Sequence, residues 1–369
     1  MEMRKKFDEI FEDCTKLGTK IKTDGYHSNG KHPIIDQGQE MVAGFTDLED
    51  GLLDAVPAIV FGDHTRIIKY VDCPFFLGAD GVKVLRSKVP NANYRYLYYA
   101  LKNAKIPNTG YNRHYKWLKE LEIEYPPIDQ QVKTVKVLDK VESIIYNRQN
   151  QLQKLDELVK ARFVELFGNP VINNKGWNVS DLGQLTIKIG SGATPKGGKE
   201  AYQTDGISLI RSMNVHNGKF EYKELAHISD EQAARLENVA VEKNDVLLNI
   251  TGASVARSCV VPTNVLPARV NQHVCIIRCK DSIMPDFINS LLIDDNYQDL
   301  LWSIAGSGAT REAITKQQVE SLQIILPPIS KQEEFSKFIN RVDKSKVAVQ
   351  KSLDEAQLLF DSLMQHYFG

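Results

Sequence analysis

The sequence predicts an α+β protein with two globular units of mixed helix and strand, each followed by a long helix, in a pseudo-twofold tandem repeat. Two observations lead to this prediction. A helix start, "YPPIDQQVKTVKVLDKV" at 125–141, returns as "LPPISKQEEFSKFINRV" at 326–342. Similar strand-like segments and turns precede both helix starts, so the repetition covers the globular units as well as the helices.

The length of 369 residues exceeds what one compact core usually holds, so at least two domains are expected. We expect a short N-terminal helix over 1–11, a first globular domain over 12–125, a long helix over 126–167, a second globular domain over 168–326 and a second long helix over 327–369. No apolar run approaches the ~20 residues of a membrane span. Five scattered cysteines without a CxxC pair favour a reduced, cytoplasmic setting.

The two long segments predict an antiparallel coiled coil. Tandem prolines suit the entrance of a helix, and Asp129 and Ser330 are good N-cap types. No proline or glycine then follows Asp129 until Gly168. Apolar residues recur in steps of three and four, which favours a coiled coil over two helices buried in a globular core. The seam positions are Leu138, Val141, Ile145, Leu152, Leu155, Val159 and Leu166, interrupted by Arg148 and Arg162, and then Phe335, Phe338, Val342, Val349, Ala356, Leu359 and Leu363, interrupted by Ser345 and Ser352.

Three further pairs of segments extend the repetition. "FDEIF" at 7–11 resembles "FVELF" at 163–167, and "LG" follows each of them. "DAVPAIVFGDHTR" at 54–66 resembles "DVLLNITGASVAR" at 245–257, where a strand leads into a small polar turn and an arginine. "GYNR" at 110–113 matches "GATR" at 308–311, shortly before each double proline.

The common catalytic motifs are missing. The residues around both "PP" pairs do not fit an amino-methyltransferase motif, and "GSGATPKGGKE" at 190–200 lacks the Gly-Lys-Ser/Thr ending of a phosphate loop. There is no H-E-x-x-H, and Cys275 and Cys279 lie in a strand-like run typical of a core. We therefore expect no catalytic residues, no metal site and no cofactor in this chain.

These features together resemble the specificity subunit of type I restriction–modification systems. The resemblance rests on the two "PPI-x-x-Q" helix starts, on "NKGWNVSDLGQL" at 174–185, and on the "FGDHTR" and "NITGAS" turns, and it spans nearly the whole chain. It implies a non-catalytic, DNA-binding subunit of a bacterial defence system. Two target-recognition domains would each read one half of an asymmetric, bipartite site in double-stranded DNA, and the helices would hold them apart.

The resemblance also implies partners. Two methyltransferase subunits would dock on the helices and use S-adenosylmethionine for DNA adenine methylation, with or without two ATP-dependent restriction subunits. The apolar content of the helices beyond one seam predicts Ile144, Leu158 and Phe163 as partner-binding residues. Two other hypotheses remain. One is a coiled-coil scaffold whose globular ends bind proteins. The other is a methyltransferase–specificity fusion or another enzyme, which the missing cofactor motifs disfavour.

The globular domains are not basic, since 12–125 carries 15 basic and 15 acidic residues and 168–326 carries 15 and 17. DNA contacts are therefore expected from polar side chains in loops rather than from a charged surface. The candidates are His64, Thr65, Arg66, Lys69, Arg113 and His114 in the first domain, and Thr194, Lys196, Arg211, Asn214, Ser254, Arg257, Asn271, Gln272, Thr310 and Arg311 in the second. The arginines that recur in both domains suit a phosphate contact or a role in the fold.

Overall fold

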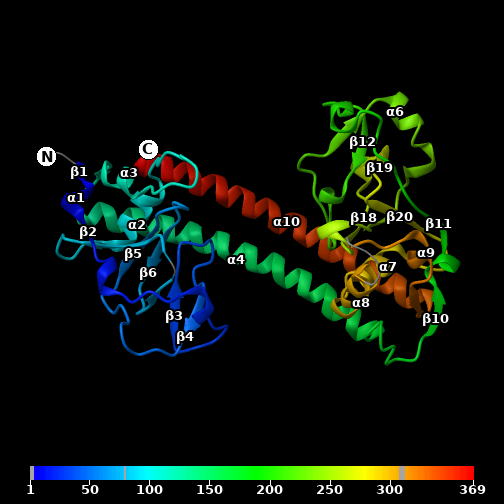
Figure 1. The fold of residues 1–369 in the computed structure, drawn as a ribbon, viewed down its shortest axis with the longest axis horizontal. Coiled ribbons are helices and arrows are strands. Elements are labelled where there is room, and N and C mark those ends of the chain that lie inside the picture. Colours follow the sequence, from blue (N-terminus) through cyan, green and yellow to red (C-terminus); the bar gives the residue numbers. More distant parts are fainter. Residues whose placement is uncertain (1–3, 79, 307–311) are drawn as a thin grey trace. The chain divides into compact units, whose positions relative to one another are not determined.

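The computed structural model describes residues 4–78, 80–306 and 312–369. The chain forms two compact units: Met1–Gln149 with Lys351–Gly369, and Asn150–Gln350. Both long helices contribute to both units (Figure 1). Within the described ranges, no helix has the length and apolar character that crossing a membrane requires.

The two long helices are present as predicted. Helix α4 spans Ile128–Phe167 and helix α10 spans Ile329–Phe368, and each has 40 residues. Both begin directly after the double proline, so Asp129 and Ser330 lie inside the first turn and the prediction that they are N-caps is wrong. At the other end of α4, the indole nitrogen of Trp177 donates a hydrogen bond of 2.9 Å to the carbonyl of Phe167.

The glutamine of each "PPI-x-x-Q" start has the same structural role. The side-chain nitrogen of Gln131 donates to the carbonyl of Pro126 at 2.8 Å, and that of Gln332 donates to the carbonyl of Pro327 at 2.8 Å. Both glutamines are 1% exposed. The motif therefore recurs because a buried amide fixes the approach of the chain to each helix.

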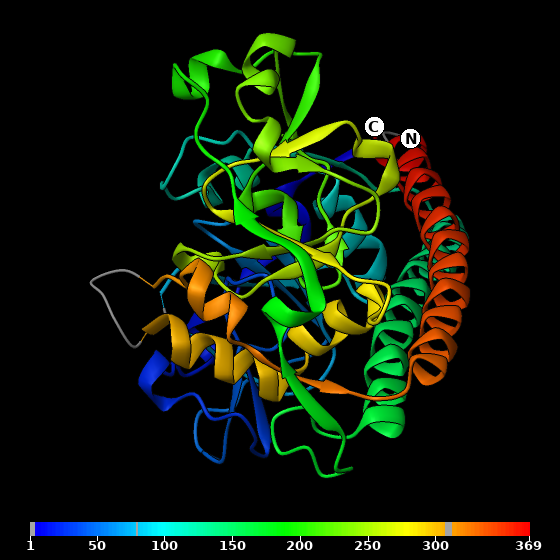
Figure 2. The same ribbon diagram turned by 90° about the vertical axis from the view of Figure 1, so that its right-hand side faces the viewer.

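Within each unit, α4 and α10 pack side by side and antiparallel (Figure 2). In the second unit, Lys346 pairs with Asp156 at 2.5 Å, and further along α4 Arg162 pairs with Glu334, which lies earlier on α10. In the first unit, the Nε of Arg148 donates to the hydroxyl of Ser352 at 3.1 Å. Arg148 and Ser352, which interrupt the apolar pattern, thus bind each other across the seam.

The predicted seam is confirmed along α4, where all nine of its positions are buried or half-buried. On α10 seven of the nine positions are buried or half-buried, including Val349 at 8% and Ala356 at 9% exposure, but Ser345 is exposed and Leu359 is 50% exposed. Phe360 and Met364 are buried instead, one position further along. A straight helix drifts against a seven-residue repeat, and here the drift turns Phe360 toward Tyr99 of the first globular domain, with ring centroids 6.1 Å apart.

The main sheet of each unit has four antiparallel strands. In the first unit the order is β2 (Phe11–Asp13), β8 (Val82–Ser87), β5 (Ala58–Gly62) and β6 (Ile68–Val71). In the second it is β11 (Thr186–Ser191), β20 (Val274–Cys279), β17 (Val246–Asn249) and β18 (Ser258–Val260). Corresponding strands occupy corresponding places, so the tandem repeat extends to the topology of the globular parts.

A separate two-stranded sheet in each unit shows that one of the predicted pairs of repeated segments is misaligned. In the first unit, β1 (Arg4–Lys6) pairs with β9 (Glu122–Glu124), and α1 (Phe7–Ile10) leads into β2. In the second, β10 (Asn178–Asp181) pairs with β21 (Gln323–Leu326), and α5 (Leu182–Leu185) leads into β11. The counterpart of "FDEIF" is therefore α5, and its likeness to "FVELF" at the end of α4 is coincidental.

The remaining elements complete the two units. In the first are β3 (His32–Ile35), β4 (Gly44–Thr46), β7 (Phe76–Leu77), α2 (Tyr94–Lys102) and α3 (Tyr115–Lys119). In the second are β12 (Ile207–Ile210), β13 (Val215–His216), β14 (Lys219–Phe220), β15 (Ala226–Ile228), α6 (Asp230–Ala234), β16 (Ala240–Val241), β19 (Ala268–Val270), α7 (Pro285–Leu292), α8 (Asp295–Gly306) and α9 (Lys316–Glu320).

The two globular parts contact the helices through different kinds of interaction, polar in the first unit and aromatic in the second. In the first unit, Arg95 on α2 pairs with Asp139 and Glu142 on α4, and the Tyr99 hydroxyl donates to Asp139 at 2.7 Å. Burial and these carboxylates raise the pKa of the Tyr99 phenol. In the second unit four phenylalanines pack with ring centroids 4.8–5.8 Å apart: Phe163, Phe167, Phe287 and Phe335.

Replacing the buried glutamines by alanine should lower the free energy of unfolding more at Gln332 than at Gln131. Gln332 also accepts the backbone N–H of Met284 at 2.9 Å, so Gln332→Ala leaves two polar groups without their partner, whereas Gln131→Ala removes the donor to one carbonyl. At ~1–3 kcal/mol for each unpaired group, we expect losses in the free energy of unfolding of about 2–6 kcal/mol for Gln332→Ala and about 1–3 kcal/mol for Gln131→Ala. Urea denaturation measures both against Gln130→Ala, an exposed neighbour. Equal midpoints for all three variants would contradict the role of these amides.

Candidate nucleic-acid interface

In the second unit, the turn between β17 and β18 borders a groove of about 350 Å³. The turn has two residues with positive φ, Gly252 at 73° and Ala256 at 70°. Asn249, at the end of β17, is fully buried and donates to the carbonyl of Ser212 at 2.8 Å, which fixes the base of the turn. The groove is lined by Ser212, Thr251, Gly252, Ala253, Ser254, Arg257 and His273.

A chain of hydrogen bonds crosses the rim of this groove. The Thr194 hydroxyl donates to Gln272 Oε1 at 2.6 Å, Gln272 Nε2 lies 3.0 Å from His273 Nε2, and His273 Nδ1 lies 2.5 Å from Thr251 Oγ1. Because an amide nitrogen only donates, His273 Nε2 accepts and the imidazole proton resides on Nδ1. These hydrogen bonds fix the orientation of the exposed Gln272 amide, which still has one N–H and one lone pair on Oε1 free to bind a ligand.

The structure thus brings together several of the predicted residues of the second domain, namely Thr194, Ser254, Arg257 and Gln272. Asn271 is 8% exposed and its side chain accepts the backbone N–H of His273 at 3.1 Å, so it supports the chain from beneath. Thr251, His273 and Ser212 were missed, because nothing in their spacing distinguishes them from other loop residues. Thr310 and Arg311 lie outside the described residues.

The equivalent turn of the first unit joins β5 to β6. The hydroxyl of Thr65 donates to the carbonyl of Gln37 at 2.7 Å, and the backbone N–H of His64 donates to the Gln37 side chain at 3.2 Å. Arg66 has φ 63° and donates to the carbonyl of Ile106 at 3.3 Å. Arg113 is exposed on the adjoining loop. These four predicted residues therefore lie around one turn, and Gln37, which organises it, was missed.

Besides Asn271, three predicted DNA contacts are buried, namely Lys69, His114 and Asn214. Lys69 is 4% exposed, pairs with Asp36 at 3.4 Å and donates to the carbonyl of Glu40 at 2.5 Å. Burial lowers the pKa of the Lys69 amine, and Asp36 opposes that shift. Lys69 therefore ties β6 to the Asp36–Glu40 segment, and the prediction that it contacts DNA is not supported.

His114 and Asn214 are both 0% exposed. His114 Nδ1 lies 3.0 Å from the carbonyl of Asp63, which also accepts its backbone N–H at 2.8 Å. The Asn214 side chain accepts the backbone N–H of Arg211 at 3.0 Å and donates to the carbonyl of Glu221 at 2.9 Å. Both side chains satisfy backbone groups inside their loops, so the prediction of DNA contact is not supported for them either.

The cationic candidates divide by their surroundings. Arg211 is half-buried over the ring of Tyr202, 5.2 Å from its centroid, and donates to the carbonyl of Glu224. Arg113, Lys196 and Arg257 have no ion-pair partner in the part of the chain that the structure describes. These three cations are available to phosphates, whereas Arg211 is committed to its own loop.

The predicted partner-binding residues lie in different environments. Ile144 is 38% exposed and Leu158 is 47% exposed, as docking requires. Phe163 is 2% exposed within the phenylalanine cluster, so the prediction that it contacts a partner is wrong. Its sequence position on α4 did not reveal that Phe287 and Phe335 would cover it.

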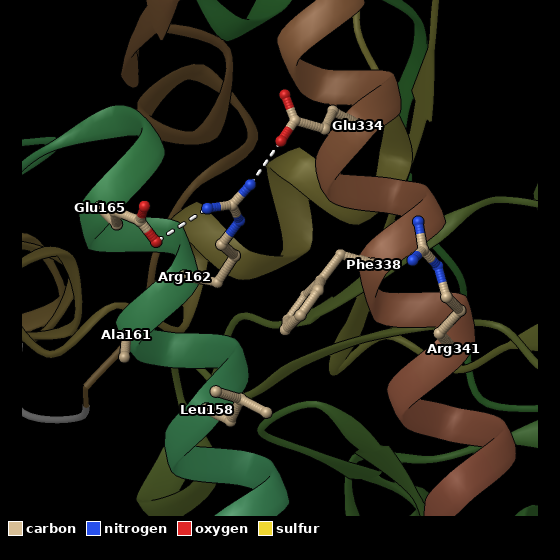
Figure 3. A pocket seen from close by; sticks show the side chains of 7 residues that line it. All are labelled: Leu158, Ala161, Arg162, Glu165, Glu334, Phe338 and Arg341. Carbon is tan, nitrogen blue, oxygen red and sulfur yellow. Dashed lines mark hydrogen bonds and ion pairs between the residues drawn. The ribbon is translucent and has the colours of Figure 1, made fainter.

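Leu158 borders a groove of about 450 Å³ between the portions of α4 and α10 that belong to the second unit (Figure 3). Arg162 lies across this groove, with ion pairs to Glu165 on its own helix and to Glu334 on α10. The lining residues are Leu158, Ala161, Arg162, Glu165, Glu334, Phe338 and Arg341. The surface combines an apolar centre with charged edges, a composition typical of protein interfaces.

Comparison with known proteins identifies the family. Residues 3–157 and 174–356 match the family model described as the type I restriction modification DNA specificity domain. The chain belongs to this family, with one match in each half of the repeat, and its function is DNA recognition within such a system. Specificity subunits are the non-catalytic components of type I complexes, so the prediction that this chain is not the enzyme agrees with its membership.

The similar proteins have low sequence identity to this chain, but several of the matches cover most of its length. The EcoR124I/EcoR124II specificity subunit of Escherichia coli is 20% identical over 350 residues, covering 90% of this chain and 84% of that protein. The putative MjaX specificity subunit of Methanocaldococcus jannaschii is 22% identical over 239 residues, covering 59% and 51%. The type I S subunit from M. genitalium superposes with a TM-score of 0.61 at 15% identity, covering 99% and 96%, and so shares the fold.

Because Phe163 is buried and Leu158 is exposed, substitution by alanine should lower the free energy of unfolding much more at Phe163 than at Leu158. Phe163→Ala removes a buried ring from the cluster and should lower the free energy of unfolding by about 3–5 kcal/mol. Leu158→Ala, on an exposed position of the same helix, should change it by less than about 1 kcal/mol. Denaturant titration compares the two. Equal, small effects would mean that the phenylalanine cluster does not hold the second unit together.

Proposed function

We propose that this chain reads an asymmetric, two-part site in double-stranded DNA, with one part read by each globular domain. The observation that supports this most strongly is the pair of equivalent turns, β5–β6 and β17–β18, which lie at the same place in the same topology but carry different side chains. A shared strand order with different side chains in the turns suits two readers that recognise different sequences. The named relatives are specificity subunits of type I restriction enzymes.

In the second domain, Gln272 is the best candidate for reading a base. An amide can form two hydrogen bonds with the major-groove edge of adenine, and here Thr194 and His273 already set its orientation. Arg257 and Lys196 supply cations for phosphates, which position a protein on DNA without reading its sequence. The weakly acidic overall balance of this domain means that most of the affinity would come from the assembled complex.

We further infer two docking faces for methyltransferase subunits, since α4 and α10 have equal length and the same start. Ile144 and Leu158 are exposed apolar residues on α4, and Leu158 borders a groove. S-adenosylmethionine for adenine methylation, and ATP if restriction subunits join, would bind to those partners. The scaffold alternative is not favoured, because the family of this chain is defined by DNA specificity.

Domain exchange tests the proposal. Residues 12–125 are replaced by the matching domain of a relative, the chain is co-expressed with its methyltransferase, and methylated adenines are mapped across the genome. One half of the methylated motif should change while the other half stays. Reciprocal exchange of 168–326 provides the matched control. A change in both halves, or in neither, would refute the assignment of one reader to each half.

A single substitution tests the base reader. Gln272→Ala should relax the motif at one position of the half read by the second domain, since a bidentate contact discriminates by about 1–3 kcal/mol. His273→Ala should have a smaller effect in the same half, because it frees the amide without removing it. Gln184→Ala, an exposed glutamine on α5, should leave the motif unchanged. If Gln272→Ala instead relaxed a position in the other half of the motif, the proposal that Gln272 reads the half-site of the second domain would be wrong.

A further inference from the structure

Tyr111 is a loop residue that neither the family membership nor the sequence motifs explain. It lies between α2 and α3, one residue after Gly110, whose φ is 77°. Its side chain is 86% exposed, more than any other large hydrophobic residue of the described chain. Exposing an aromatic ring to this extent is unfavourable in water, so the position needs an explanation.

The ring is nevertheless supported on one face. Its plane lies 8° from that of His64, with centroids 4.6 Å apart, so the two rings are stacked. His64 is itself fixed, because its backbone N–H binds Gln37 and its ring edge lies against Gly81, where an added Cβ would come within 2.8 Å of His64 Cδ2. One face of Tyr111 is therefore covered by a supported ring, and among the described residues no aromatic ring contacts its opposite face.

The place of this stack restricts what it would bind. His64 and Thr65 belong to the turn proposed to read DNA, and Arg113, an exposed cation without an ion-pair partner among the described residues, follows two positions after Tyr111. A flat, preorganised π face beside a cation suits a nucleobase attached to phosphate. In a duplex both faces of a base are covered by its neighbours, so such contact needs a step that is locally unstacked, as apolar wedge residues achieve.

We infer that Tyr111 is a stacking residue whose outer face takes a nucleobase at an unstacked step of the first half-site, with His64 as its support. This inference rests on the proposed function. The sequence also indicates that only the first domain has this stacking residue. The segment "GYNR" at 110–113 aligns with "GATR" at 308–311, where alanine occupies the position of the tyrosine. The first domain would then read partly by deformation of the DNA and the second by hydrogen bonds.

The test uses the full chain in complex with its methyltransferase and duplexes that contain the methylated motif. Tyr111→Ala should weaken binding by about 5- to 150-fold, the range for loss of one aromatic–base stack, and Tyr111→Phe should bind like the unmodified complex. Tyr111→Leu should bind more weakly than Tyr111→Phe, because it keeps an apolar side chain without the ring face. Tyr222→Ala, half-exposed in the second unit, serves as the control.

A scan with abasic sites then locates the stacked base. At one position of the first half-site, removal of the base should weaken binding of the duplex to the unmodified complex. The Tyr111→Ala complex should bind that abasic duplex and the intact duplex equally well. Additive losses at every position, or unchanged affinity of Tyr111→Ala, would overturn the inference. So would loss of the methyltransferase from the variant complex. If instead the unmodified complex does not prefer its motif over other duplexes, the proposed function itself fails.

Discussion

The apolar seam of α4 and α10 is the constraint on which the rest of the structure depends, because it completes both cores. Leu138 and Val141 of α4 join Phe360 and Met364 of α10 in the core of the first unit. Phe163 of α4 and Phe335 of α10 lie in the main core of the second. Each globular part would expose a large apolar face without these helices. The repeated helix is therefore part of two hydrophobic cores as well as a connection between them.

This arrangement separates the groups that hold the fold together from the turns that carry exposed polar side chains. The buried amides of Gln131 and Gln332 and the seam fix how each helix begins and packs, and none of these groups lies at the reading turns. The two turns project from equivalent strands of equivalent sheets. His64 of the first turn stacks with Tyr111 of a neighbouring loop, whereas Thr251 of the second joins a chain of hydrogen bonds through His273. Substitutions in these loops can thus change the exposed side chains at little cost to the cores.

The long-range plan was predictable from the sequence because it depends on periodicity. Proline pairs, uninterrupted helical segments and three-four spacing identified α4, α10 and nearly all of the seam. The predictions failed where three-dimensional neighbours decide the outcome. The sequence did not distinguish Phe163 from the exposed apolar residues of α4, but the phenylalanine cluster buries it. Near the end of α10, Phe360 is buried in place of Leu359 because the first globular domain packs against it.

The candidate site was less predictable for a related reason. Polar loop residues such as His64, Arg257 and Gln272 were identified from composition, but composition does not distinguish a side chain that faces solvent from one that satisfies its own backbone. Lys69, His114 and Asn214 are of the second kind, and their hydrogen bonds are to segments distant in sequence or to backbone carbonyls. Thr251 and His273 join the site only through tertiary contacts.

The central claim is that one chain presents two different readers to one DNA molecule. The most direct measurement is genome-wide mapping of methylated adenines in cells that express the unmodified chain with its methyltransferase as their only such system. The account predicts a motif with two specified segments of different sequence, separated by a gap of fixed length in which any base is accepted. A single uninterrupted motif, or two identical segments related by twofold symmetry, would contradict it.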